Sequence, residues 1–96
     1  MGELLSDREI ECAIGRLDKW LLQNGAIEKW FKFESFTDSI RFVNLVADLA
    51  EAKNHHPDIN IRYRNVEIVL STHSQNAVTI LDTELAAAID SISIAE

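Results

Sequence analysis

All three histidines of the chain lie within 19 residues, and they are the side chains best suited to transfer protons. His55 and His56 are adjacent and precede Pro57, while His73 lies at the end of the next predicted hairpin. Because histidine ionises near neutral pH, its imidazole can either donate or accept a proton there. The pattern predicts a general acid–base site where a turn and a strand end converge.

Three other interpretations of these histidines stay open. Histidines in exposed turns commonly have no function beyond structure. Three imidazoles can bind zinc, but neighbouring residues rarely direct both rings at one ion, and the helical spacing of four is absent. Ser71 and Ser74 flank His73, which would suit nucleophilic catalysis, but no Gly-x-Ser-x-Gly motif is present. We expect an acid–base site without a metal.

Two carboxylates are placed to support the histidines. Glu51 lies near the end of one predicted helix and Asp82 near the start of another. Either carboxylate could accept a hydrogen bond from an imidazole and select its tautomer. Each also has a structural explanation, since Glu51 could be a solvated helix residue and Asp82 could complete a helix cap with Thr79.

The elements that must position these residues follow from the apolar patterns. Ser6 and Glu9 have capping-box spacing. Asn24-Gly25 and Arg64-Asn65 are suited to the two-residue turns of hairpins. The predicted elements are a helix over about 7–18, a hairpin with flanks at 19–22 and 27–33, a helix over 35–53, a hairpin over 58–72 and a helix from 79.

This order predicts a single α+β domain over residues 1–96. We expect a four-stranded antiparallel sheet with three helices packed on one face, in the order α-β-β-α-β-β-α. The helix over 35–53 has an apolar arc of about 220°, wider than one small core requires. Its apolar residues are Phe36, Ile40, Phe42, Val43, Leu45, Val46, Ala47, Leu49 and Ala50. A subunit contact through this helix is therefore expected.

Composition narrows the classes of partner. Nine basic against sixteen acidic residues give a net charge of −7, which argues against nucleic acid and anionic membranes. No apolar run approaches the roughly 20 residues of a membrane span. The N-terminus lacks the features of a secretory signal, so a cytoplasmic protein is expected. The lone Cys12 permits no internal disulfide, and we expect it to be a half-buried apolar side chain.

A set of spaced residues carries a family resemblance. The set comprises Glu51-x-x-x-His55-His56-Pro57, Tyr63 six residues after the proline, Ser71-Thr72-His73, and Asp82 nine residues after His73. This pattern resembles the signature of pterin-4a-carbinolamine dehydratases, over about residues 6–94. Trp20 also matches a tryptophan that the family has in its first hairpin. Two positions depart from the family, Ala77 where glycine is usual before the last helix and Ile59 near a common aromatic.

The resemblance implies a reaction and a set of site residues. Such enzymes are carbon–oxygen lyases that dehydrate 4a-hydroxytetrahydropterin to quinonoid dihydropterin, in tetrahydropterin recycling, without metal or cofactor. The implied catalytic residues are His55, His56, His73 and Glu51. The implied substrate-binding residues are His55, His56, Pro57, Ser71, Thr72, His73, Ser74, Gln75 and Asp82.

The resemblance also implies an assembly and an alternative function. A homodimer or homotetramer would form through helix 35–53 and the sheet edges. The alternative is a non-enzymatic binding module on the same fold, acting as a dimerisation cofactor or an assembly factor. The intact histidine set favours the enzyme, because a scaffold has no physical need for it.

Overall fold

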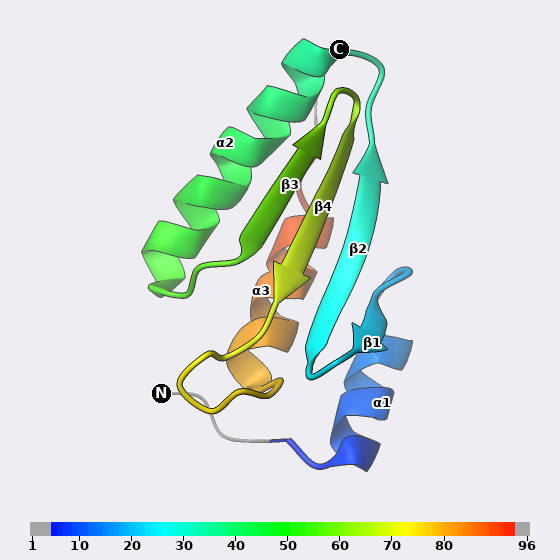
Figure 1. Ribbon diagram of the computed structural model, residues 1–96, viewed down its shortest axis with the longest axis vertical. Helices are drawn as coiled ribbons and strands as arrows, with labels where there is room; N and C mark the ends of the chain where they lie inside the picture. Colours follow the sequence, from blue (N-terminus) through cyan, green and yellow to red (C-terminus); the bar gives the residue numbers. More distant parts are fainter. Residues whose placement is uncertain (1–4, 94–96) are drawn as a thin grey trace.

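The computed structural model describes residues 5–93 and has the predicted α+β architecture (Figure 1). Four antiparallel strands form one sheet in the order β1-β2-β4-β3, and the core lies between one face of this sheet and the helices. The elements are α1 (Asp7–Gly15), β1 (Leu21–Gln23), β2 (Ala26–Lys32), α2 (Phe36–Lys53), β3 (Asp58–Arg62), β4 (Asn65–Leu70) and α3 (Ile80–Asp90). The predicted fold class and element order are confirmed.

Alternation of side chains decides which face of the sheet is buried. On β2 and β4, Ile27 lies opposite Leu70 and Phe31 lies opposite Val66, all on the helix-covered face. The intervening residues, such as Trp30, point to the other face, and Trp30 is 52% exposed. A two-residue period therefore builds one apolar face against α2 and α3.

The two hairpin turns test the predicted registers. Gln23 pairs with Ala26, so Asn24-Gly25 forms the predicted turn, and both residues have positive φ as a tight hairpin turn requires. In the second hairpin Arg62 pairs with Asn65. Its loop is therefore residues 63–64, and the prediction of Arg64-Asn65 was wrong by one position.

The observed second turn keeps a large ring outside the sheet. Tyr63 has a φ of 56° and is 66% exposed, and its ring stacks on Phe36 with 6.5 Å between centroids. Arg64 lies over the same ring at 5.3 Å. These contacts hold Tyr63 in the loop. The predicted register would instead have paired Tyr63 with Val66.

The first helix begins as predicted and ends earlier. Ser6 and Glu9 form a capping box, and the backbone N–H and hydroxyl of Ser6 lower the pKa of Glu9. The helix ends at Gly15 rather than at about 18, because the next amides bond to carbonyls three residues back and Lys19 has a φ of 65°. Cys12 is exposed on this helix, so its predicted half-burial was wrong.

Helix α2 packs on the sheet through one side only. Its buried residues are Ser39, Phe42, Val46 and Ala50, and the ring of Phe42 lies between Phe31 and Phe33 at centroid distances of 4.7 and 4.9 Å. Phe36 and Ala47, which belong to the predicted apolar arc, are exposed on its flank. The arc is thus wider than the core that covers it.

A polar contact ties the last helix to the first hairpin. The Trp20 indole N–H donates to the Asp90 carboxylate at 3.0–3.1 Å, and Lys29 Nζ lies 2.7 Å from the same group. Trp20 is 2% exposed, so its only polar atom is satisfied inside the core. Within residues 5–93 no helix is long and apolar enough to cross a membrane. The expected absence of a signal concerns a segment that includes residues 1–4, outside the described part.

Candidate active site

The end of α2 sets the position of His55. Asn54 adopts the left-handed conformation, its N–H bonds to the Glu51 carbonyl at 3.2 Å, and the N–H of His55 bonds to the Ala50 carbonyl at 3.1 Å. This pattern is a Schellman motif, which turns the chain sharply away from the helix axis. Pro57 then prevents helical continuation, so His55 leaves the helix in a defined direction.

His55 is held by a fully buried carboxylate. Its Nε2 lies 2.5 Å from Asp82 Oδ1, with side-chain exposures of 10% for His55 and 0% for Asp82. Asp82 also completes the capping box of α3, because its Oδ2 accepts the Thr79 N–H at 2.8 Å. The two explanations considered for Asp82 are therefore both realised, since one oxygen caps the helix and the other binds the imidazole.

His73 lies in a tight turn after β4. The strand ends at Leu70, earlier than the predicted 72, and a bridge between Thr72 and Ala77 closes the turn. The His73 side chain is exposed and makes no hydrogen bond to any residue in the described range 5–93. The positive φ of this turn falls on Asn76, not on Ala77, so the departure at Ala77 brings no left-handed strain.

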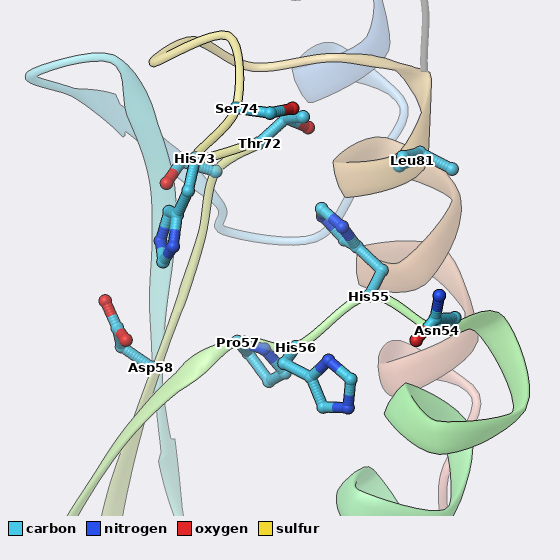
Figure 2. A pocket seen from close by; sticks show the side chains of 10 residues that line it. Asn54, His55, His56, Pro57, Asp58, Thr72, His73, Ser74 and Leu81 are labelled. Carbon is cyan, nitrogen blue, oxygen red and sulfur yellow. The ribbon is translucent and has the colours of Figure 1, made fainter. Parts of the chain in front are cut away.

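His56 forms a separate pair with Glu51. Its Nε2 lies 2.5 Å from Glu51 Oε2, and the two side chains are 57% and 76% exposed. In Figure 2 the His56 ring extends away from the space between His55 and His73. The adjacent histidines therefore occupy two environments, one buried beside Asp82 and one open to solvent.

The segments enclose a polar pocket of about 450 Å³. Figure 2 shows the rings of His55 and His73 on opposite sides of it, one from the end of α2 and one from the turn after β4. The lining residues are Asn54, His55, His56, Pro57, Asp58, Ser71, Thr72, His73, Ser74 and Leu81.

The structure sorts the predicted site residues into two groups. The pocket lining includes His55, His56, Pro57, Ser71, Thr72, His73 and Ser74. Three predicted residues do not line it: Glu51 contacts the outer side of His56, Asp82 is buried behind His55, and Gln75 lies in the turn with its N–H on the Thr72 carbonyl at 3.0 Å. Ile59 packs against the core instead of the pocket.

Three lining residues were missed in the sequence. They are Asn54, Asp58 and Leu81. Asp58 opens β3 directly after Pro57 and pairs with Val69 of β4, but its carboxylate has no hydrogen bond or ion pair with any residue between 5 and 93. The sequence signal for Asp58 was its position directly after the His-His-Pro triplet. A residue that opens a strand lies at the end of the sheet, where pockets of this kind form.

The geometry suits transfer of two protons at different points of one bound molecule. A carboxylate-bound imidazole and an unpartnered imidazole face the same space, so one can act as acid while the other acts as base. Among the residues from 5 to 93, no three His, Cys, Asp or Glu side chains are grouped as metal ligands.

The fold and this pocket define a class of small α+β protein in which two histidines from separate elements face one pocket. The family model described as pterin 4 alpha carbinolamine dehydratase matches residues 3–92. The chain belongs to this family, as its spaced residues predicted.

Similar sequences cover nearly the whole chain. A Roseiflexus castenholzii protein, provisionally named pterin-4-alpha-carbinolamine dehydratase, is 50% identical over 96% of this chain and 99% of its own length. A Mycobacterium protein with the same provisional name, from strain KMS, is 44% identical over 93% of this chain and 95% of its own length.

Solved structures share the fold. A Brucella melitensis protein described as a transcriptional coactivator/pterin dehydratase superposes with a TM-score of 0.88 at 34% identity, covering 92% of this chain and 96% of that one. A pterin dehydratase-like protein identified as a RuBisCO assembly factor in the alpha-carboxysome gives a TM-score of 0.63 at 24% identity, covering 78% and 87%. The second likeness concerns the fold alone.

Proposed function

We propose that this protein dehydrates 4a-hydroxytetrahydropterin to quinonoid dihydropterin plus water, and that it does so by histidine acid–base catalysis. The observation that carries the proposal is the placement of His55 and His73 on opposite sides of one pocket. Family membership supplies the substrate class.

The proposed reaction requires one proton to be given and one to be taken. A protonated imidazole donates to the 4a-hydroxyl, the C4a–O bond breaks, and water leaves. A neutral imidazole removes the proton from the adjacent ring nitrogen N5, and that N–H electron pair forms the new C4a=N5 double bond. Such general acid–base assistance accelerates reactions by about 100- to 10,000-fold.

The other residues of the proposed site have binding and supporting roles. Pro57, Ser71 and Ser74 form walls of the pocket. Glu51 would orient His56, to which it is bound, in the way that a carboxylate fixes an imidazole tautomer. Asp58 adds an unpaired negative charge to the lining, which suits the amino and N–H donors of a pterin ring.

Stopped-flow measurement of dehydration, using chemically generated 4a-hydroxytetrahydropterin, tests the proposal. The protein is expected to accelerate the spontaneous loss of water, and a strong chelator is expected to leave that acceleration unchanged. Chelator sensitivity would restore the metal-site interpretation. An absence of acceleration by folded protein would remove the enzymatic one.

A second candidate function is a binding or assembly module. It is favoured by the exposed apolar flank of α2, by the free edge of β3, and by the descriptions of the Brucella protein and the carboxysome assembly factor. Phe42, which belongs to the apolar arc of the expected subunit contact, faces the sheet and is 2% exposed. The partner surface would instead include Phe36 and Ala47.

The same flank is proposed to join subunits in a homodimer or homotetramer. Ala47→Glu would place a charge in this contact, so it is expected to shift the sedimentation coefficient to that of a monomer at micromolar concentration. Asn44→Glu is the matched control, because position 44 lies on the exposed polar side of the same helix. Equal sedimentation of the two variants would exclude a contact at Ala47.

A further inference from the structure

A chain of hydroxyl groups leads from the start of α3 to the carboxylate that binds His55. Thr72 is 5% exposed and Thr79 is 0% exposed, and their Oγ1 atoms lie 2.6 Å apart. Thr72 Oγ1 lies 2.9 Å from Asp82 Oδ2, and Thr79 Oγ1 accepts the Leu81 N–H at 3.2 Å. Within the described residues every buried side-chain nitrogen and oxygen has such a partner.

The direction of each hydrogen bond in this chain can be worked out. Asp82 Oδ2 accepts the Thr79 N–H, and as a carboxylate oxygen it can accept a second hydrogen bond from Thr72 Oγ1. Thr72 must therefore donate its hydroxyl hydrogen to Oδ2, and in its contact with Thr79 it can only accept. Thr79 consequently donates to Thr72, and its own oxygen accepts from Leu81.

These directions determine the protonation pattern at His55. Two donors satisfy Oδ2 of the buried Asp82 carboxylate, which would be costly to leave unpaired in the core. A carboxylate only accepts, so the proton in the contact with His55 belongs to Nε2. Nδ1 is then the ring nitrogen left for a molecule in the pocket.

We propose that Thr72 and Thr79 are positioning residues for His55, because they hold Oδ2 of Asp82 and so turn Oδ1 toward Nε2, which presents His55 to the pocket through Nδ1. This inference deepens the proposed function, and its kinetic test rests on that function. It also reassigns Thr72 from substrate contact to support.

The remaining polar groups of Thr72 agree with that reassignment. Its N–H donates to the Ala77 carbonyl at 2.8 Å, and its carbonyl accepts the Gln75 N–H at 3.0 Å. Its hydroxyl hydrogen is used on Asp82, as argued above. No donor of Thr72 is left for a ligand, although the residue lines the pocket.

Nitrogen-15 NMR of the histidine rings tests the protonation pattern without any substrate. In the unmodified protein, neutral His55 is expected to carry its proton on Nε2. In Asp82→Asn, the amide oxygen should stay with the two donors and the NH₂ group should face His55, which moves the ring proton to Nδ1. A wild-type ring protonated on Nδ1 would overturn the proposal, whatever the variants do.

Kinetics separate a positioning role from a substrate contact. Thr72→Val removes only the hydroxyl and is expected to lower kcat about tenfold with little change in KM. Thr72→Ser should restore the rate. Thr83→Val is the control and should match the wild type, because it removes a hydroxyl on α3 that bonds, among residues 5–93, only to the Ile80 carbonyl.

The outcomes are distinguishable. A raised KM at unchanged kcat in Thr72→Val would make Thr72 a substrate contact and overturn the inference. Should the valine variant fail to fold, the wild-type NMR result and the serine variant still decide the matter. A protein without dehydratase activity, but with the expected Nε2 proton and its inversion in Asp82→Asn, would contradict the proposed function and leave this inference standing.

Discussion

Replacing His73 with alanine is expected to lower kcat/KM for dehydration by about 100- to 10,000-fold, the usual contribution of a general acid or base. The thermal unfolding midpoint should stay almost unchanged. The His73 ring is exposed and has no hydrogen-bond partner among residues 5–93, so its removal breaks no packing and leaves no buried group unsatisfied. Stopped-flow rates and thermal unfolding of the same preparation measure the two quantities.

Two further measurements make this result specific. Added imidazole should recover part of the lost rate in His73→Ala, because the vacated position is open to solvent. Asn60→Ala, on the face of β3 away from the core and outside the pocket lining, should keep the full rate. A fully active His73→Ala variant would remove His73 from the mechanism.

His55→Ala should behave differently from His73→Ala. It removes the partner of a fully buried carboxylate, so a loss of stability is expected together with the loss of rate. The rate lost in His73→Ala therefore reports the chemical contribution of that histidine alone. In His55→Ala the loss of rate is combined with a loss of stability.

Replacing Phe42 with alanine is expected to cost about 3–5 kcal/mol of folding free energy. The ring is 2% exposed and packs between Phe31 and Phe33, which fixes α2 to the sheet. Small domains have only about 5–15 kcal/mol of total stability. At about 4–8 °C per kcal/mol for a chain of this size, the midpoint of thermal unfolding should fall by at least about 12 °C.

Phe36→Ala is the matched control for this loss. It changes the same residue type in the same helix, but Phe36 is 50% exposed and touches Tyr63 rather than the core. In the monomer, where the flank of α2 is free of any subunit contact, the expected cost of Phe36→Ala is below about 1 kcal/mol. Both variants are compared by urea unfolding at one protein concentration. Comparable losses of folding free energy would show that the Phe42 side does not fix α2 to the sheet.

Local patterns allowed most of the fold to be predicted, and non-local contacts account for the misses. The capping spacing of Ser6 and the Asn24-Gly25 turn depend on neighbouring residues, and both were predicted correctly. The second hairpin register depends on Phe36, which lies 27 residues before Tyr63 and stacks on it. No local pattern contains that contact.

The candidate site, too, was predictable where local patterns decide it and unpredictable where contacts distant in the sequence decide it. The proximity of His55 and His73 could be predicted because a helix end and a strand end meet at one edge of the layer. Whether Asp58 at the start of β3 or Gln75 in the turn lines the pocket depends on the direction of each side chain, and the turn that closes at Thr72 and Ala77 was not foreseen. That Asp82 has both of its possible roles depends on the approach of His55, 27 residues earlier in the chain, to the start of α3.

Because the chain leaves α2 through the left-handed turn at Asn54, the length of α2 determines where His55 lies in the pocket. The helix spans 18 residues, and its start is fixed by the Ser35 cap and by the N–H of Phe33 bonded to the Arg64 carbonyl. One inserted residue would carry His55 about 1.5 Å along the axis and rotate it by about 100°, out of reach of Asp82. Insertions and deletions in α2 should therefore be rarer among functional relatives than substitutions on its outer side.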